Sequence, residues 1–137
     1  TCLVPADFTE WNPQLGSRCG MTNEAFTQWA WNDPSIQAMA EPYKGAVEGV
    51  RRMKEGGATI WIVTSTSCPM LVQPWLRRWG IPFGRAILTN DKASVEWDLL
   101  IDDNPLTLAS LAASGRRVLR HRLPWNEHLV GVEGMSW

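Results

Sequence analysis

Adjacent carboxylates at Asp102-Asp103 are the first residues of this sequence whose type and spacing could do chemistry. They follow an apolar run, Leu99 to Ile101, which has the composition of a buried strand. Two neighbouring carboxylates repel each other unless a cation offsets them, and Mg²⁺ prefers oxygen ligands. The pair therefore predicts a magnesium site. The alternative is a helix N-cap pair leading into Pro105, because Asp is favoured at that position.

Two further segments carry groups that could hold a phosphate. Thr64 and Ser65 end the apolar run 58–63, where a hydroxyl and free backbone N–H groups can bind a phosphate oxygen. Lys92 could neutralise a phosphoryl group during its transfer. The alternatives are ordinary turn capping for the two hydroxyls and a solvated loop position for the lysine.

The elements that must position these residues alternate along the chain. Helices are predicted over 22–31, 36–40, 42–55, 69–79 and 106–114, and strands over 58–63, 85–88, 98–101 and 117–120. This alternation favours an α/β fold, a doubly wound parallel sheet. Ligands bind outside the carboxyl ends of the strands in such sheets. Thr64 and Asp102-Asp103 both fall at such ends, so we expect them to share one site with Lys92.

Composition excludes several classes of protein. With 137 residues, a formal net charge of −1 and 45% hydrophobic residues, the chain suits one globular domain, and nucleic acid is an unexpected partner. No apolar run is long enough to predict a membrane span. Three cysteines without a CxxC motif favour reduced thiols and a cytoplasmic protein. Nine tryptophans leave room for a homo-oligomer interface. His121 and His128 have no third ligand nearby, which argues against a metal site there.

Beyond these single residues, an ordered pattern resembles the 5′(3′)-deoxyribonucleotidases, a branch of the haloacid-dehalogenase (HAD) phosphatases. The segment 86–105, AILTNDKASVEWDLLIDDNP, carries the longest match. Glu41 to Glu48, Ile62 to Ser65 and Leu123 to Asn126 resemble further elements of that family in the same order.

The resemblance implies a HAD-like Rossmannoid fold and an Mg²⁺-dependent phosphomonoester hydrolase acting on nucleotides. Thr64 would bind the phosphoryl oxygen as the motif II hydroxyl, with Ser65 assisting. Lys92 would be the motif III lysine, and Asp102 and Asp103 the motif IV acids holding Mg²⁺. Residues 9–40 would form a small helical cap inserted into the single domain 1–137. In that cap, Phe26, Trp29 and Trp31 could stack on a base, although packing is the alternative role for each.

One part of the family pattern is absent from the sequence. The motif I pair DxD, which supplies the attacking aspartate and the acid that protonates the leaving alcohol, is missing. Val4 to Phe8 resembles the segment that follows motif I, so we expect the pair just upstream of Thr1. Two alternatives stay open. In one, Cys2 to Val4 form a degenerate central strand in an inactive HAD-fold binding or structural module. In the other, Asp7 acts as a displaced nucleophile.

Overall fold

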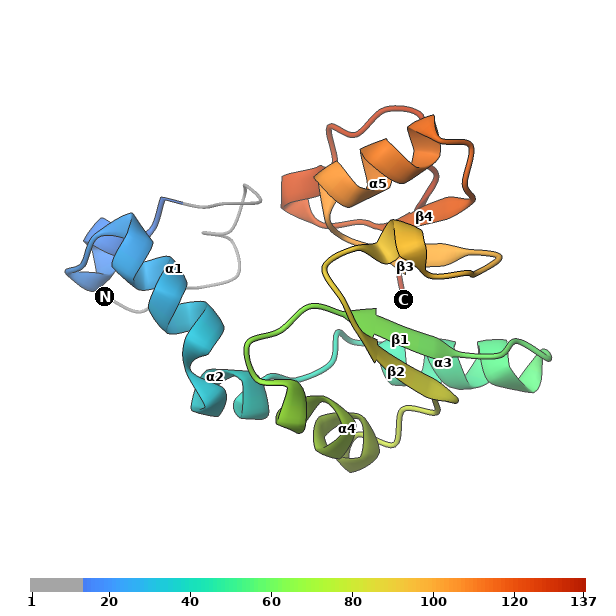
Figure 1. The fold of residues 1–137 in the computed structure, drawn as a ribbon, viewed down its shortest axis with the longest axis horizontal. Helices are drawn as coiled ribbons and strands as arrows, with labels where there is room; N and C mark the ends of the chain where they lie inside the picture. Colours follow the sequence, from blue (N-terminus) through green and yellow to red (C-terminus); the bar gives the residue numbers. More distant parts are fainter. Residues whose placement is uncertain (1–13) are drawn as a thin grey trace. The chain divides into compact units, whose positions relative to one another are not determined.

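A computed structural model describes residues 14–137, which fold into helices and parallel strands (Figure 1). The described chain divides into two compact units, residues 14–26 with 91–136 and residues 27–90 with Trp137, and each is described by itself. In chain order the elements are η2 (Gly16–Cys19), α1 (Asn23–Asn32), α2 (Pro34–Met39), α3 (Ala46–Glu55), β1 (Trp61–Thr64), α4 (Pro69–Arg78), β2 (Arg85–Leu88), η3 (Lys92–Ser94), β3 (Leu100–Asp102), α5 (Pro105–Ala113), β4 (Val118–His121), η4 (Pro124–Asn126) and β5 (Gly134–Met135).

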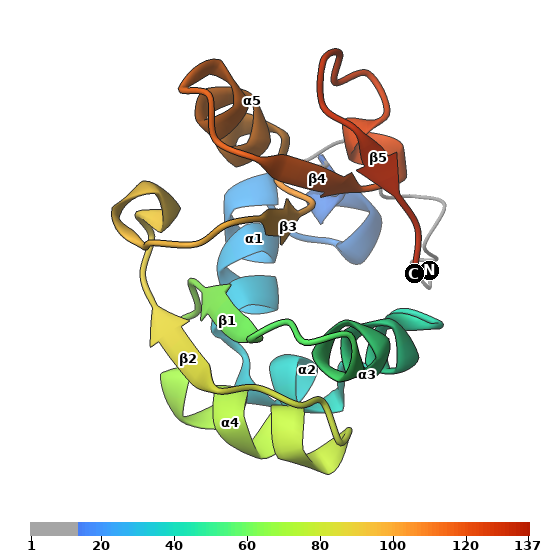
Figure 2. The same cartoon turned by 90° about the vertical axis from the view of Figure 1, so that its right-hand side faces the viewer.

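The unit formed by residues 27–90 is built on a two-stranded parallel sheet. β1 pairs with β2 in a register that places Trp61 beside Arg85 and Thr64 beside Leu88. The connection between the two strands passes through α4, as a parallel pair requires (Figure 2). Because both strands run in the same direction, Thr64 lies at the carboxyl end of this sheet.

Helix α3 begins later than the sequence predicted. We expected a helix from Pro42, but the first helical residue is Ala46. Gly45 precedes it with a positive φ of 87°, a conformation that only glycine adopts readily. A Cβ at Gly45 would also lie 2.9 Å from the main-chain carbon of Trp137. The Pro42–Gly45 stretch is therefore the turn that leads into the helix rather than its first turn.

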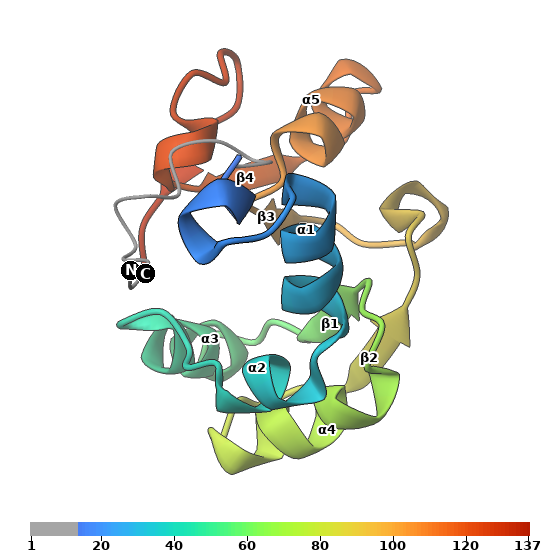
Figure 3. The same cartoon turned by 90° about the vertical axis from the view of Figure 1, so that its left-hand side faces the viewer.

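Two proline-initiated helices complete this unit. Pro34 and Pro69 each occupy the start of a helix, where a missing N–H costs nothing. Asp33 caps α2 by accepting the backbone N–H of Ser35 at 2.8 Å. Helix α2 packs against α4 (Figure 3), and Leu76 of α4 is buried at 4% exposure.

The second unit is organised around the three-stranded parallel sheet β3-β4-β5. Leu100 pairs with Val118, and Asp102 with Arg120, so Asp102 is the last residue of its strand. Helix α5 packs against β4. Its Leu108 and Leu111 form the core with Leu100 and Val132, all less than 9% exposed. Strand β5 was not predicted, since a two-residue strand gives no periodicity.

The α/β class is confirmed by these parallel strands and interspersed helices. Within residues 14–137 the strands form two separate sheets, so the doubly wound sheet stays a prediction. The single domain with residues 9–40 as a cap also stays a prediction. Asp7 and the expected strand at Cys2 to Val4 lie outside the described residues. In the described part of the chain, each helix is too short or too polar to cross a membrane.

Candidate functional site

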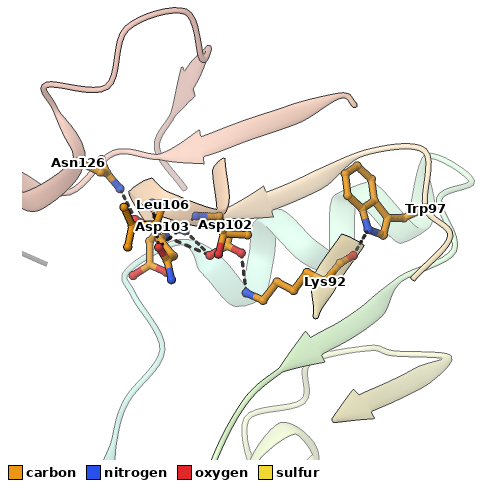
Figure 4. Close-up of polar contacts among 8 residues, drawn as sticks. Lys92, Trp97, Asp102, Asp103, Leu106 and Asn126 are labelled. Atoms are coloured by element: carbon orange, nitrogen blue, oxygen red, sulfur yellow. Dashed lines mark hydrogen bonds and ion pairs between the residues drawn. The ribbon is translucent and has the colours of Figure 1, made fainter. Parts of the chain in front are cut away.

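Asp102 and Lys92 form a buried ion pair at the carboxyl end of β3 (Figure 4). The Nζ of Lys92 donates to Oδ2 of Asp102 at 2.5 Å, and the two side chains are 20% and 4% exposed. Oδ1 of Asp102 accepts the backbone N–H groups of Asp103 at 2.8 Å and Asn104 at 3.1 Å. Three donors thus hydrogen-bond the Asp102 carboxylate. Lys92 and Asp102 therefore lie close together, as the sequence predicted.

Asp103 lies in a less favourable environment for a charge. Burial raises the pKa of its carboxyl to about 6, and the negative charge of Asp102 acts in the same direction. Lys92 lowers this pKa but offsets the other two effects only in part. A partly buried carboxylate next to a second carboxylate is an environment that a hard divalent cation would neutralise. The donor set therefore fits Mg²⁺ chemically.

The ligand set at this position is incomplete within the described residues. Across residues 14–137 no group of three or more His, Cys, Asp or Glu side chains gathers in a way that could hold a metal ion. Mg²⁺ is commonly bound by one or two carboxylates, with waters and substrate phosphate oxygens as its other ligands. Two carboxylates match the number that this mode of binding uses, and they are too few for a cage made of protein alone.

The helix after the acidic pair is capped by another residue. Asn104 is the N-cap of α5, and its Oδ1 accepts the N–H groups of Leu106 at 3.0 Å and Thr107 at 3.3 Å. We had considered that Asp102 and Asp103 serve as the cap pair. Because Asn104 takes that role, capping α5 does not account for the Asp103 carboxylate.

The main chain around Lys92 is fixed by a tryptophan and an arginine that the sequence analysis did not single out. The indole Nε1 of Trp97 donates to the carbonyl oxygen of Lys92 at 3.2 Å. Arg116 donates to the carbonyls of Ala93 at 2.7 Å and Val95 at 2.8 Å, and its guanidinium lies 3.6 Å from the centre of the Trp97 ring. Through these contacts the two side chains hold the main chain at Lys92, Ala93 and Val95 in place. Sequence spacing gives no signal for Arg116, because it lies 23 and 21 residues from its carbonyl partners Ala93 and Val95.

In the other unit, Thr64 ends β1 and borders a small cavity. The carbonyl of Thr64 accepts the N–H of Thr89 at 3.0 Å, and the Ser65 hydroxyl hydrogen-bonds the Asn90 side chain. A cavity of about 200 Å³ opens beside Thr64, Thr66 and Gln37. Its remaining lining is largely apolar: Ile62, Cys68, Leu71, Val72, Trp75 and Leu76. The cavity is smaller than the roughly 300–1,000 Å³ typical of ligand pockets, so it suits part of a ligand.

The three aromatic residues considered for base stacking differ in exposure. Phe26 is 6% exposed and packs in the core, whereas Trp29 and Trp31 of α1 are 47% and 58% exposed. Trp29 and Trp31 therefore present ring surface to solvent, and their stacking role stays a prediction. Asp7, the displaced-nucleophile candidate, lies outside the residues that the structure describes.

Comparison with known proteins places the chain among nucleotidases. The family described as "5′ nucleotidase, deoxy (Pyrimidine), cytosolic type C protein" matches residues 3–137. A human protein named 5′(3′)-deoxyribonucleotidase, mitochondrial, is 33% identical over 74% of this chain and 48% of its own length. A Chlorobaculum tepidum protein, whose name assigns it provisionally to the 5′(3′)-deoxyribonucleotidases, is 25% identical over 88% of this chain and 66% of its own length.

The chain thus spans about half the length of the human relative and under two thirds of the bacterial one. No solved structure shows significant similarity to it.

Proposed function

Since this chain belongs to the deoxy 5′-nucleotidase family of cytosolic type C, we propose that it is an Mg²⁺-dependent phosphomonoester hydrolase acting on 5′-deoxyribonucleotides. The observation that carries the proposal is the Lys92–Asp102 ion pair beside Asp103. It brings a cation for the phosphoryl group and two acids for a metal ion to one strand end.

We assign each described residue one role in this reaction. Asp102 and Asp103 hold Mg²⁺, which supplies Lewis-acid stabilisation of the phosphoryl oxygens. Lys92 stabilises the negative charge that develops during transfer, and its ion pair with Asp102 keeps the ammonium oriented before substrate binds. In the proposed reaction an aspartate of motif I attacks the phosphate, as the sequence resemblance implies.

Thr64 and Ser65 are proposed to bind the phosphate together with Lys92. Their position supports this role, because both follow the carboxyl end of a parallel strand, as Asp102-Asp103 does. The cavity beside Thr64 supports it further, since Thr64, Thr66 and Gln37 line it with groups that can hydrogen-bond a ligand. Trp29 and Trp31 would then contribute stacking surface for the base.

The proposed geometry requires one doubly wound sheet. Among residues 14–137, β1 pairs only with β2, and β3 pairs only with β4. Each therefore keeps one edge without a described partner, and unpaired parallel edges are unfavourable. We propose that the strand carrying motif I pairs with both edges. Protection of the β1 and β3 edge amides from hydrogen exchange in the full-length protein would support this arrangement.

A reducing compartment such as the cytoplasm is also part of the proposal. Cys19 and Cys68 are free thiols, which persist where disulfides do not form. The mitochondrial location in the name of the human relative belongs to that protein.

The test is phosphate release from dUMP and dTMP by the full-length protein in the presence of Mg²⁺. We expect turnover, and a loss of about 100-fold or more in kcat/KM for Lys92→Met. Lys54→Met, an exposed lysine of α3, is the matched control and should leave turnover unchanged. Nucleotide binding without any phosphate release would contradict the enzyme and favour the inactive binding module.

A further inference from the structure

We propose that Asn126 is a positioning residue for the acidic pair, holding the Asp103–Asn104 peptide in the orientation that cation binding needs. This inference rests on the proposed function and adds to it a residue from a different segment of the chain. Figure 4 shows the Asn126 side chain directed at the Asp102-Asp103 turn. The proposal depends on the hydrogen bonds that join these residues.

Asn126 is fully buried, and both the nitrogen and the oxygen of its side-chain amide form hydrogen bonds. Nδ2 donates to the carbonyl oxygens of Asp103 and His121, each at 2.9 Å. Oδ1 accepts the backbone N–H of Leu123 at 3.1 Å. The exposed fraction of the residue is 0%. A buried amide with all these bonds has a single orientation, so it can transmit a fixed geometry to Asp103.

The main chain of Asn126 is itself held from β4. Nη1 of Arg120 donates to the carbonyls of Asn126 at 2.6 Å, Glu127 at 2.9 Å and Leu129 at 3.4 Å. The carbonyl of Asn126, the last residue of η4, also accepts the backbone N–H of Leu129 at 3.1 Å. Arg120 therefore fixes the turn from which Asn126 extends toward Asp103.

The peptide between Asp103 and Asn104 is hydrogen-bonded through both its carbonyl oxygen and its N–H. Its carbonyl oxygen accepts from Asn126, and its N–H donates to Oδ1 of Asp102 at 3.1 Å. A planar peptide held at both its oxygen and its hydrogen cannot rotate. The Cα of Asp103 is thereby fixed relative to the Asp102 carboxylate, which restricts where the Asp103 carboxyl group can lie. Groups outside the ligand set commonly determine metal affinity in this way.

The experiment is a titration of the full-length protein with Mg²⁺, followed by the backbone amide resonances of Asp103 and Asn104. Three proteins are compared: the unaltered chain, Asn126→Ala and Val132→Ala. Val132 is 8% exposed in the core of the same unit, so its truncation is a control for general loosening. We expect Asn126→Ala to weaken Mg²⁺ binding about tenfold or more, and Val132→Ala to change it by less than about twofold.

The outcomes separate this inference from the proposed function. Equal Mg²⁺ affinity in Asn126→Ala and the unaltered chain would overturn the positioning role and leave the magnesium site standing. An unaltered chain whose Asp103 and Asn104 resonances do not respond to Mg²⁺ would overturn both. If Asn126→Ala does not fold, the inference is tested instead by following the Asn126 side-chain amide resonance of the unaltered chain during the Mg²⁺ titration. This resonance should shift with the same midpoint as Asp103, and a resonance that does not move overturns the inference.

Discussion

Lys92 and Asp102 form an ion pair in which Nζ and Oδ2 lie 2.5 Å apart, although the two residues belong to different elements of the chain. Asp102 sits at the end of a buried strand, and Lys92 is carried by a short 3-10 turn that Trp97 and Arg116 hold in place. The pair gives the acidic turn its only nearby positive charge among the interactions described for residues 14–137. The first prediction concerns its removal.

Replacing Lys92 by Met should destabilise the folded chain. Asp102 would keep its two backbone donors but lose the charged one, leaving a buried carboxylate without a cation. We expect the free energy of unfolding to fall by on the order of 2 kcal/mol. Urea unfolding at neutral pH measures this loss. Lys54→Met should have little effect, and equal unfolding midpoints for the two variants would contradict the importance of the ion pair.

The acidic turn should also make stability depend on pH. The pKa of Asp103 is raised from 3.8 to about 6 in the folded chain, so the native state binds more protons than the unfolded state between these values. The free energy of unfolding contributed by Asp103 therefore falls as pH rises from about 4 to 6 and stays low above that range.

Asp103→Asn should remove this dependence. Without Mg²⁺, the variant should be more stable than the unaltered chain at pH 7, by on the order of 1 kcal/mol, while losing any stabilisation by added Mg²⁺. Urea unfolding at several pH values, with and without Mg²⁺, measures both effects. Asp98→Asn, at an exposed position, is the control. Parallel pH profiles for Asp103→Asn and the unaltered chain would show that Asp103 has an ordinary carboxyl pKa.

Much of this site could be predicted from the sequence, because its polar residues follow apolar runs that form strands. Thr64 and Asp102 do end parallel strands, and Lys92 does approach Asp102. The start of α3 was misplaced: the helical apolar spacing begins only at Ala46, and the backbone needs a turn at Gly45. Asn126 was noted only as part of the Leu123 to Asn126 element, and Arg116 was not singled out. Their partners are main-chain carbonyls of distant segments, and side-chain patterns carry no signal of such contacts.

Arg116 should be needed as an arginine rather than merely as a positive charge. Its two carbonyl contacts and its stacking on Trp97 depend on the planar guanidinium, which an ammonium cannot replace. Both Arg116→Ala and Arg116→Lys should therefore loosen the 92–97 segment. Hydrogen exchange at these amides should rise by about tenfold in each variant, while amides of α4 remain unchanged. Full protection in Arg116→Lys would show that charge alone is sufficient.

Loss of the α5 cap should cost stability without affecting the charges. Asn104→Ala removes the acceptor for the N–H groups of Leu106 and Thr107 and should lower the free energy of unfolding by about 1 kcal/mol. Asn104→Ser, which keeps a capping oxygen, should recover most of that loss. An Ala variant as stable as the Ser variant in thermal unfolding would mean that α5 does not depend on its cap.

The central claim is that Thr64, Lys92 and the two acids bind one phosphate and its cation. The most direct measurement uses Mn²⁺ as a paramagnetic substitute for Mg²⁺, together with inorganic phosphate, in the full-length protein. Mn²⁺ should broaden the amide resonances of Asp103 and Thr64 together, at the same metal concentration. Broadening around Asp103 that leaves Thr64 and Ser65 sharp would contradict a shared site.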